Sequence, residues 1–120
     1  MRSEVSENLR LVADNREVEI KWRRYKIKKN DTFFNVMART MLNHDTISSV
    51  NRLASLWDVT QGDEWLLPNV RGIAVTGEKK LIAKKFGIST DTLIPIPERD
   101  NYYFITGLHF DDIAKLMRAL

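Results

Sequence analysis

Apolar and polar positions alternate with a period of two in the first part of the chain. The apolar members of this alternation are Leu9, Leu11 and Ala13 before a polar break at 14–16, and Val18, Ile20 and Trp22 after it. Alternation on both sides of an Asx-containing turn predicts a β-hairpin. We therefore expect an N-terminal β-hairpin in residues 1–24, whose second strand continues through Tyr25 to Ile27.

The period changes to that of a helix after Asn30. The apolar positions that share one helical face are Phe33, Val36, Met37 and Met41. Asp31 is the expected N-cap, with Thr32 as a substitute, because short polar side chains accept hydrogen bonds from the free N–H groups of a first turn.

A second helical segment follows and closes the pattern. Asp45 is its expected cap, and the residues expected to face inward are Ile47, Val50 and Ala54. A glycine turn and a short strand at 64–67 then end at Pro68. The predicted order is strand, helix, helix, strand, and we expect Asn51 to bond to nearby backbone within this unit.

The segment from Tyr25 to Asn69 resembles a LysM domain. Three blocks carry the resemblance in order: Tyr25, Ile27, Asp31, Thr32, Phe33 and Val36; Ile47, Val50, Asn51 and Leu53; and Gly62, Trp65, Leu67 and Pro68. Asn30 replaces the usual glycine, a mild departure because asparagine tolerates a left-handed backbone. Met37 replaces a usual small residue and implies local repacking. The resemblance implies an α+β fold with a LysM domain at 25–69.

Residues 70–107 are similar to a degenerate second LysM-like unit. At an offset of 46 residues, Ile27 falls on Ile73 and Val36 on Ile82. Pro95 and Pro97 stop any helix where the second helix of the copy belongs. The copy has also lost the capping carboxylate and Phe33, so we expect no independent sugar site in it. Residues 108–120 predict an amphipathic helix, and an end on its apolar face suggests a longer protein.

The resemblance also implies a site. LysM domains bind N-acetylglucosamine-containing glycans in a shallow groove between two loops. The positions carried over are Asn30, Asp31, Thr32, Phe33, Leu56, Trp57, Asp58 and Val59. An aromatic ring such as that of Trp57 suits the apolar face of a sugar. The residues alone leave other roles open: capping for Asp31, a core position for Phe33, and packing against the N-terminal hairpin for Trp57.

Composition and charge narrow the function further. The net charge is +3, and six of the nine residues in 21–29 are basic, which indicates either a solvated strand face or a patch that contacts a polyanion. The chain has no cysteine and two histidines, His44 and His109, whereas a catalytic zinc site needs about three protein ligands. No apolar run approaches the roughly 20 residues of a membrane span. We expect no catalytic residue, metal or cofactor, and no membrane span in this segment.

Two other functions are disfavoured by the sequence. Ala83, Gly87 and Leu93 have the spacing of a DNA-binding helix-turn-helix at 81–97, but Pro95 and Pro97 shorten the recognition helix. The chain also resembles, weakly, the noncatalytic region of lysostaphin-like zinc peptidases of the cell wall. Their metal motifs are absent, so any peptidase domain is expected beyond Leu120.

The sequence therefore predicts noncatalytic binding of peptidoglycan or a chitin-like glycan. The chain is expected to anchor a larger peptidase-like protein in the cell envelope, periplasm or extracellular space, without nucleic acid and with another envelope protein as a further partner. The alternative is a protein-interaction module of LysM fold without glycan binding, in which the degenerate copy packs over the groove.

Overall fold

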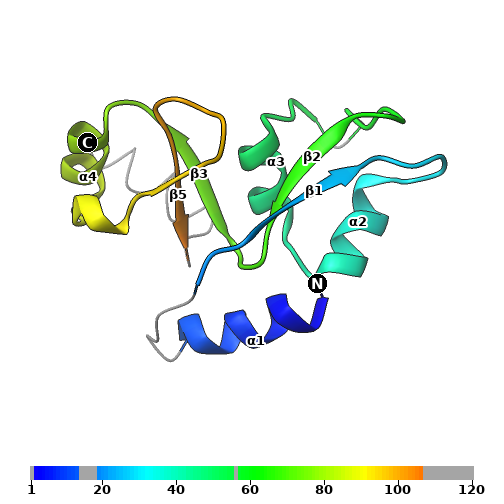
Figure 1. Cartoon of the computed structure of the whole chain (residues 1–120), viewed down its shortest axis with the longest axis horizontal. Helices are drawn as coiled ribbons and strands as arrows, with labels where there is room; N and C mark the ends of the chain where they lie inside the picture. The colour runs from blue at the N-terminus through cyan, green and yellow to red at the C-terminus, as the bar shows by residue number, and fades with distance from the viewer. Residues whose placement is uncertain (1, 14–18, 56, 107–120) are drawn as a thin grey trace.

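The computed structural model describes residues 2–13, 19–55 and 57–106, which form an α+β fold (Figure 1). The first part holds α1 (Arg2–Ala13), β1 (Trp22–Lys26), α2 (Phe33–Thr40), α3 (His44–Asn51) and β2 (Glu64–Pro68). The second part holds β3 (Gly72–Thr76), α4 (Lys79–Phe86), the 3-10 turn η1 (Thr90–Thr92), β4 (Ile94–Pro95) and β5 (Tyr102–Thr106). We call residues 22–69 the first unit and residues 70–106 the second unit.

The predicted N-terminal hairpin is wrong, because residues 2–13 form helix α1. Its inward positions follow helical spacing: Val5 and Asn8 are buried and Leu9 is half-buried. The hairpin was predicted from the alternation of Leu9, Leu11 and Ala13, which does not include Val5. Val5 is fully buried in the core. Of the predicted second strand, the part from Trp22 to Lys26 is strand β1. It pairs with β2 and not with an N-terminal strand.

The predicted βααβ order of the first unit is confirmed. β1 pairs antiparallel with β2, with Tyr25 opposite Trp65, and α2 and α3 lie between them in the chain. Two further backbone bonds extend the pairing to Ile27, which donates to the Asp63 carbonyl at 2.7 Å and accepts from Gly62 N–H at 2.9 Å.

Period-two alternation gives the first sheet an inner and an outer face. Tyr25 and Ile27 pack with the core of the first unit, on the same face as Arg23. Trp22 lies on the opposite face with Arg24 and Lys26, and its ring meets Phe104 of the second unit edge-on at 5.3 Å. Trp22 and Ile27 therefore lie on opposite faces of the first sheet.

The core of the first unit joins α1, α2, α3 and the first sheet. Its buried members are Val5, Ile27, Phe33, Val36, Leu42, Ile47, Trp65 and Leu67. Met37 and Met41, which share the predicted apolar face of α2, pack against this core from its partly exposed rim.

Thr32, the predicted substitute for Asp31, is the N-cap of α2, whereas the predicted cap of α3, Asp45, is wrong by two residues. Thr32 caps α2, its hydroxyl accepting from Asn35 N–H at 3.1 Å, and Asn43 caps α3 by accepting from Thr46 N–H at 3.1 Å. Asp31 and Asp45 are therefore not the N-caps. α3 ends earlier than expected, at a left-handed Arg52 with φ of 55°, so Ala54 is exposed and does not face inward.

Of the two helices of the predicted repeat, the second unit reproduces only the first, whereas its first and last strands, β3 and β5, pair antiparallel as β1 and β2 do. α4 has the same eight-residue length as α2 and starts 46 residues later, at Lys79 rather than Phe33. Its N-cap, Glu78, makes no side-chain capping bond, as predicted. Residues 90–97 contain η1 and β4 and no recognition helix for a helix-turn-helix. The helix predicted at 108–120 lies outside the described residues.

Helix α3 lies between the two sheets and joins the units (Figure 1). The Thr46 hydroxyl donates to the Gly72 carbonyl at 2.9 Å and accepts from the Gly72 N–H at 3.0 Å. The Ser49 hydroxyl accepts from Ala74 N–H at 3.0 Å, and the Tyr102 hydroxyl donates to the Ser49 carbonyl. Hydrogen bonds from one face of α3 therefore hold the second sheet against the first unit.

One buried cluster of the second unit is shared with the first unit, and another, formed by Ile82, Ala83, Leu93 and Ile105, lies within the second unit. Val50 and Leu66 of the first unit are buried in one cluster with Val70, Ile96, Tyr102 and Phe104.

A fragment of residues 71–120 lacks Val50, Leu66 and Val70 of this cluster and the whole of α3. We expect this fragment to show no cooperative thermal transition, whereas the full chain shows one. A cooperative transition of the fragment, accompanied by chitooligosaccharide binding, would contradict this dependence.

Candidate functional site

The loops on either side of α2 and α3 enclose a pocket of about 180 Å³. The residues that line it are Asp31, Thr32, Phe33, Phe34, Trp57 and Val59. Five of the eight sequence-predicted site residues thus meet here. Asn30 and Asp58 are exposed but do not line the pocket, and Leu56 lies outside the described residues. We call this site the aromatic pocket.

A tight turn between β1 and α2 shapes the first wall of the pocket. Asp31 N–H donates to the Lys28 carbonyl at 3.1 Å, and Asn30 has a left-handed φ of 71°. The expectation that asparagine serves here in place of glycine is therefore confirmed. The Asp31 carboxylate also accepts from Lys28 N–H at 2.8 Å, which closes the turn a second time.

Asp31 is the centre of a polar network rather than a helix cap. Its carboxylate accepts from the Tyr25 hydroxyl at 2.6 Å and from the Arg39 guanidinium at 2.9 Å, and Arg39 also donates to the Tyr25 oxygen at 2.8 Å. Chiefly the bond from Tyr25, and then that from Lys28 N–H, lowers the pKa of Asp31 below its ordinary value. The carboxylate that holds this wall therefore stays ionised to a lower pH than an ordinary aspartate does.

The network predicts a specific pH dependence of stability. Because the folded-state pKa of Asp31 is depressed, its contribution is present above the unfolded pKa of about 3.9 and is lost as pH falls through the folded value. We expect Asp31→Asn to lower the unfolding free energy by about 1.5–3 kcal/mol at pH 7, as for other hydrogen bonds to charged groups. Urea unfolding at pH 7 and near pH 2.5 measures this. We expect the difference in unfolding free energy between wild type and variant to be smaller near pH 2.5 than at pH 7. An equal difference at both pH values would contradict this role of Asp31.

The second wall is marked by an exposed tryptophan. The Trp57 side chain is 83% exposed, so it does not pack against the N-terminal segment, which was the competing role for it. Its backbone is fixed by a turn in which Trp57 N–H donates to the Ser55 hydroxyl at 3.2 Å and Asp58 N–H donates to the Ser55 carbonyl at 3.2 Å. Val59 anchors this wall by packing against the core.

Two phenylalanines at the start of α2 have opposite roles. Phe33 is 1% exposed, and its ring lies 5.8 Å from that of Trp65 and 5.5 Å from that of His44, so it contributes to the pocket from the core side. Phe34 is 53% exposed and lines the same pocket. Sequence reasoning missed Phe34, although an apolar residue off the buried helical face was a usable signal.

Asn51 supports the second wall from within the fold. Its side-chain amide donates to the Leu66 carbonyl at 2.9 Å and accepts from Leu66 N–H at 2.7 Å. It also donates to the Ile47 carbonyl at 3.0 Å. The predicted structural role of Asn51 is therefore confirmed, because it ties the end of α3 to β2.

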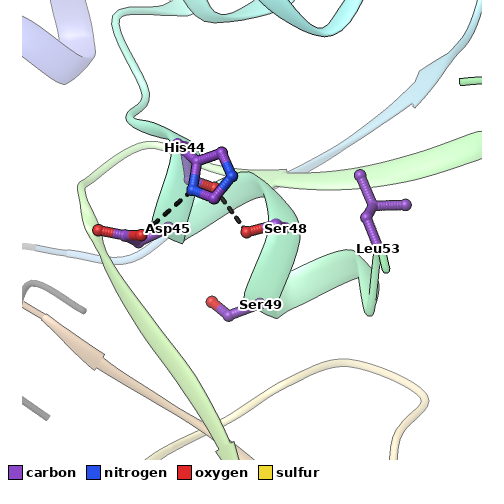
Figure 2. A pocket seen from close by; sticks show the side chains of 5 residues that line it. All are labelled: His44, Asp45, Ser48, Ser49 and Leu53. Carbon is purple, nitrogen blue, oxygen red and sulfur yellow. Dashed lines mark hydrogen bonds and ion pairs between the residues drawn. The ribbon is translucent and has the colours of Figure 1, made fainter. Parts of the chain in front are cut away.

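A second pocket, of about 240 Å³, lies along α3 (Figure 2). It is lined by His44, Asp45, Ser48, Ser49 and Leu53. His44 Nδ1 lies 3.2 Å from the Asp45 carboxylate, but the Ser48 hydroxyl donates to the His44 carbonyl at 2.8 Å. Ser48 is thus bonded to backbone and is not paired with the imidazole, which is not the arrangement of a base-activated nucleophile.

Over the described parts of the chain, no group of three or more His, Asp or Glu side chains is arranged to hold a metal ion. None of the helices described there has the length and apolar character to cross a membrane. Comparison with protein-family models, with curated proteins and with solved structures finds no match to this chain.

Proposed function

We propose that this protein is a noncatalytic glycan-binding module, in which residues 25–69 form a LysM domain that binds N-acetylglucosamine-containing polymers such as peptidoglycan. The observation that carries the proposal is the aromatic pocket, because the first turn of α2 and the loop after α3 bring two exposed aromatic side chains, Phe34 and Trp57, to one concave site. Exposed aromatic rings beside a few polar groups are typical of carbohydrate sites.

The lining of the pocket matches the chemistry of an N-acetylated sugar. Trp57 and Phe34 offer flat apolar surfaces to the C–H face of a pyranose ring, and Val59 suits an acetyl methyl group. The first-turn N–H group of Phe34 has no partner within the described residues, and Phe34 is exposed, so this group can donate to an acetamido carbonyl. The Thr32 hydroxyl accepts from Asn35 and keeps its own hydrogen free to donate.

The Asp31 network makes this site rigid before a ligand arrives. Tyr25, Arg39 and the Lys28 N–H all bond to Asp31, which fixes the turn that carries the first wall. A wall held in place in the free protein loses less conformational entropy on binding. In this proposal the module anchors a larger cell-envelope protein, because polymers of this chemistry form the wall.

An interaction module with a blocked groove is the alternative, and the position of the second unit weighs against it. The second unit packs on α3 through Gly72, Ala74 and Tyr102, whereas every residue lining the aromatic pocket comes from positions 31–59. The pocket is therefore not filled by described residues of the second unit.

Retention on insoluble peptidoglycan tests the proposal. We expect the purified chain to cosediment with peptidoglycan, and Trp57→Ala to reduce the bound fraction strongly. Leu81→Ala is the matched control, because Leu81 is a similarly exposed apolar residue, at 63%, on α4 of the second unit. Failure of the wild-type chain to bind, or equal loss in the two variants, would contradict the proposal.

A further inference from the structure

Six basic residues lie along β1 and the turn that leads to the aromatic pocket, with Arg23 on the inner face of the sheet and Arg24 and Lys26 on the outer face. All six are exposed: Lys21, Arg23, Arg24, Lys26, Lys28 and Lys29. We call these residues the basic strip. Among the described strands β1 pairs with β2 alone, so the strip follows an edge strand and then enters the turn before α2.

Most of the strip is not neutralised within the protein. Arg24 pairs with Glu64 at 2.9 Å and with Glu98 of the second unit. The other five side chains make no ion pair in the described parts of the chain. Charged residues on an edge strand also discourage edge-to-edge pairing. That role does not account for Lys28 and Lys29, which follow β1 and lie in the turn.

This turn brings the strip to the rim of the pocket. Lys28 is bonded to Asp31 through both its N–H and its carbonyl, and Lys29 lies between them in the chain. Two virtual bonds of 3.8 Å place the Lys29 Cα within about 8 Å of the Asp31 Cα. A lysine side chain anchored this close is long enough for its ammonium group to approach a ligand at the rim, and charges closer than the Debye length of about 8 Å are not fully screened at physiological salt. From Lys28 back to Lys21 the strip extends for roughly 23 Å at about 3.3 Å per residue.

The carboxylates nearby do not cancel the strip. Asp31 is bonded to Arg39 and Tyr25, and Glu64, although opposite Lys26 in the sheet, is bonded to Arg24. Asp58 is exposed on the second wall, and Asp63 is exposed in the turn before β2, where its carbonyl accepts from Ile27 N–H at 2.7 Å. The five unpaired cations of the basic strip outnumber these two exposed carboxylates.

We propose that the basic strip extends the glycan site, and that the ligand is a wall glycan carrying anionic groups, carboxylates or phosphates, beside its N-acetylglucosamine units. This inference rests on the proposed function and names the class of polymer. A neutral chitin chain gains nothing from unpaired cations, whereas an acidic polymer seated on the pocket meets Lys28 and Lys29 in the turn and then Lys26 on the outer face of β1.

Chemically modified wall material distinguishes the source of the negative charge. The full chain is incubated with native sacculi, with sacculi whose carboxylates are converted to amides, and with sacculi stripped of phosphate polymers. We expect retention to fall on one or both modified preparations, and the preparation with the loss identifies the carboxylate or the phosphate. Equal retention on all three would overturn the proposal.

Two triple variants with the same change in net charge locate the effect. Lys26→Gln/Lys28→Gln/Lys29→Gln removes part of the strip, and Lys80→Gln/Lys84→Gln/Lys85→Gln removes three exposed charges from α4. On native sacculi at low salt we expect the β1 variant to bind on the order of tenfold more weakly than wild type, because each exposed ion pair contributes a fraction of a kcal/mol. We expect the α4 variant to bind as wild type does. Loss in neither variant, or equal loss in both, would overturn the proposal.

The two proposals fail in different ways. If Trp57→Ala loses binding on every preparation while charge has no effect, the glycan site stands and the basic strip plays no part in it. If binding depends on the strip and is unaffected by Trp57→Ala, the proposed pocket is wrong.

Discussion

Replacing Trp57 by alanine is expected to weaken chitooligosaccharide binding by roughly tenfold to a hundredfold. A large apolar ring that becomes covered by ligand contributes about 1.5–3 kcal/mol, and each 1.4 kcal/mol is a factor of ten in affinity. Titration calorimetry with N-acetylglucosamine oligomers measures the change. Because Trp57 is 83% exposed, the same substitution should leave the unfolding free energy within about 0.5 kcal/mol of wild type.

Trp57→Phe separates stacking from general packing. A smaller ring keeps a flat face, so we expect this variant to recover part of the affinity that alanine loses. An alanine variant that binds as tightly as wild type would show that this ring does not contact the sugar.

Phe33→Ala is expected to have the largest effect on stability. Phe33 is 1% exposed and packs between Trp65 and His44, and removing a buried phenylalanine costs about 3–5 kcal/mol. For a small domain this lowers the melting temperature by more than about 10 °C. Thermal and urea unfolding measure the loss.

The neighbouring phenylalanine is the matched control for this prediction. Phe34 is 53% exposed, so Phe34→Ala should change stability little and instead weaken glycan binding. If the two variants were equally unstable, the assignment of Phe33 to the core and Phe34 to the pocket would be wrong.

The order of elements in the first unit was predictable because its helical faces and chain breakers are clear. Phe33 and Val36 fall on one helical face and are buried, and a buried apolar run along β2 lies between a glycine turn and Pro68. The N-terminal segment was not predictable in the same way. Its apolar residues fit two periods, and only the burial of Val5 against the first unit selects the helix.

The aromatic pocket was predictable in position and less so in detail. Resemblance placed Asp31, Thr32 and Trp57 together, but both Asp31 and Thr32 are good caps by residue type. Which of them caps depends on Tyr25 and Arg39, which approach Asp31 from β1 and from the far end of α2. Such contacts are tertiary and are not encoded in a local pattern.

The junction of the two units was the least predictable feature. The sequence indicated that so reduced a second unit leans on the first unit or on the C-terminal helix, but not that α3 is the shared element. Thr46 and Ser49 make that junction through bonds to Gly72 and Ala74, some 25 residues away in the chain. Small hydroxyl residues within a helix give no distinctive signal of such a role.

The indole N–H signals of the three tryptophans offer the most direct test of glycan binding at the aromatic pocket. Trp65 is 2% exposed and Trp22 is half-buried, whereas Trp57 is 83% exposed, so the three should respond differently to a ligand. The account predicts that an N-acetylglucosamine oligomer shifts chiefly the indole signal that is missing in Trp57→Phe, together with backbone amides of residues 31–34 and 57–59. Saturating oligomer or solubilised peptidoglycan that leaves these signals unmoved, or that moves only signals of the second unit, would contradict it.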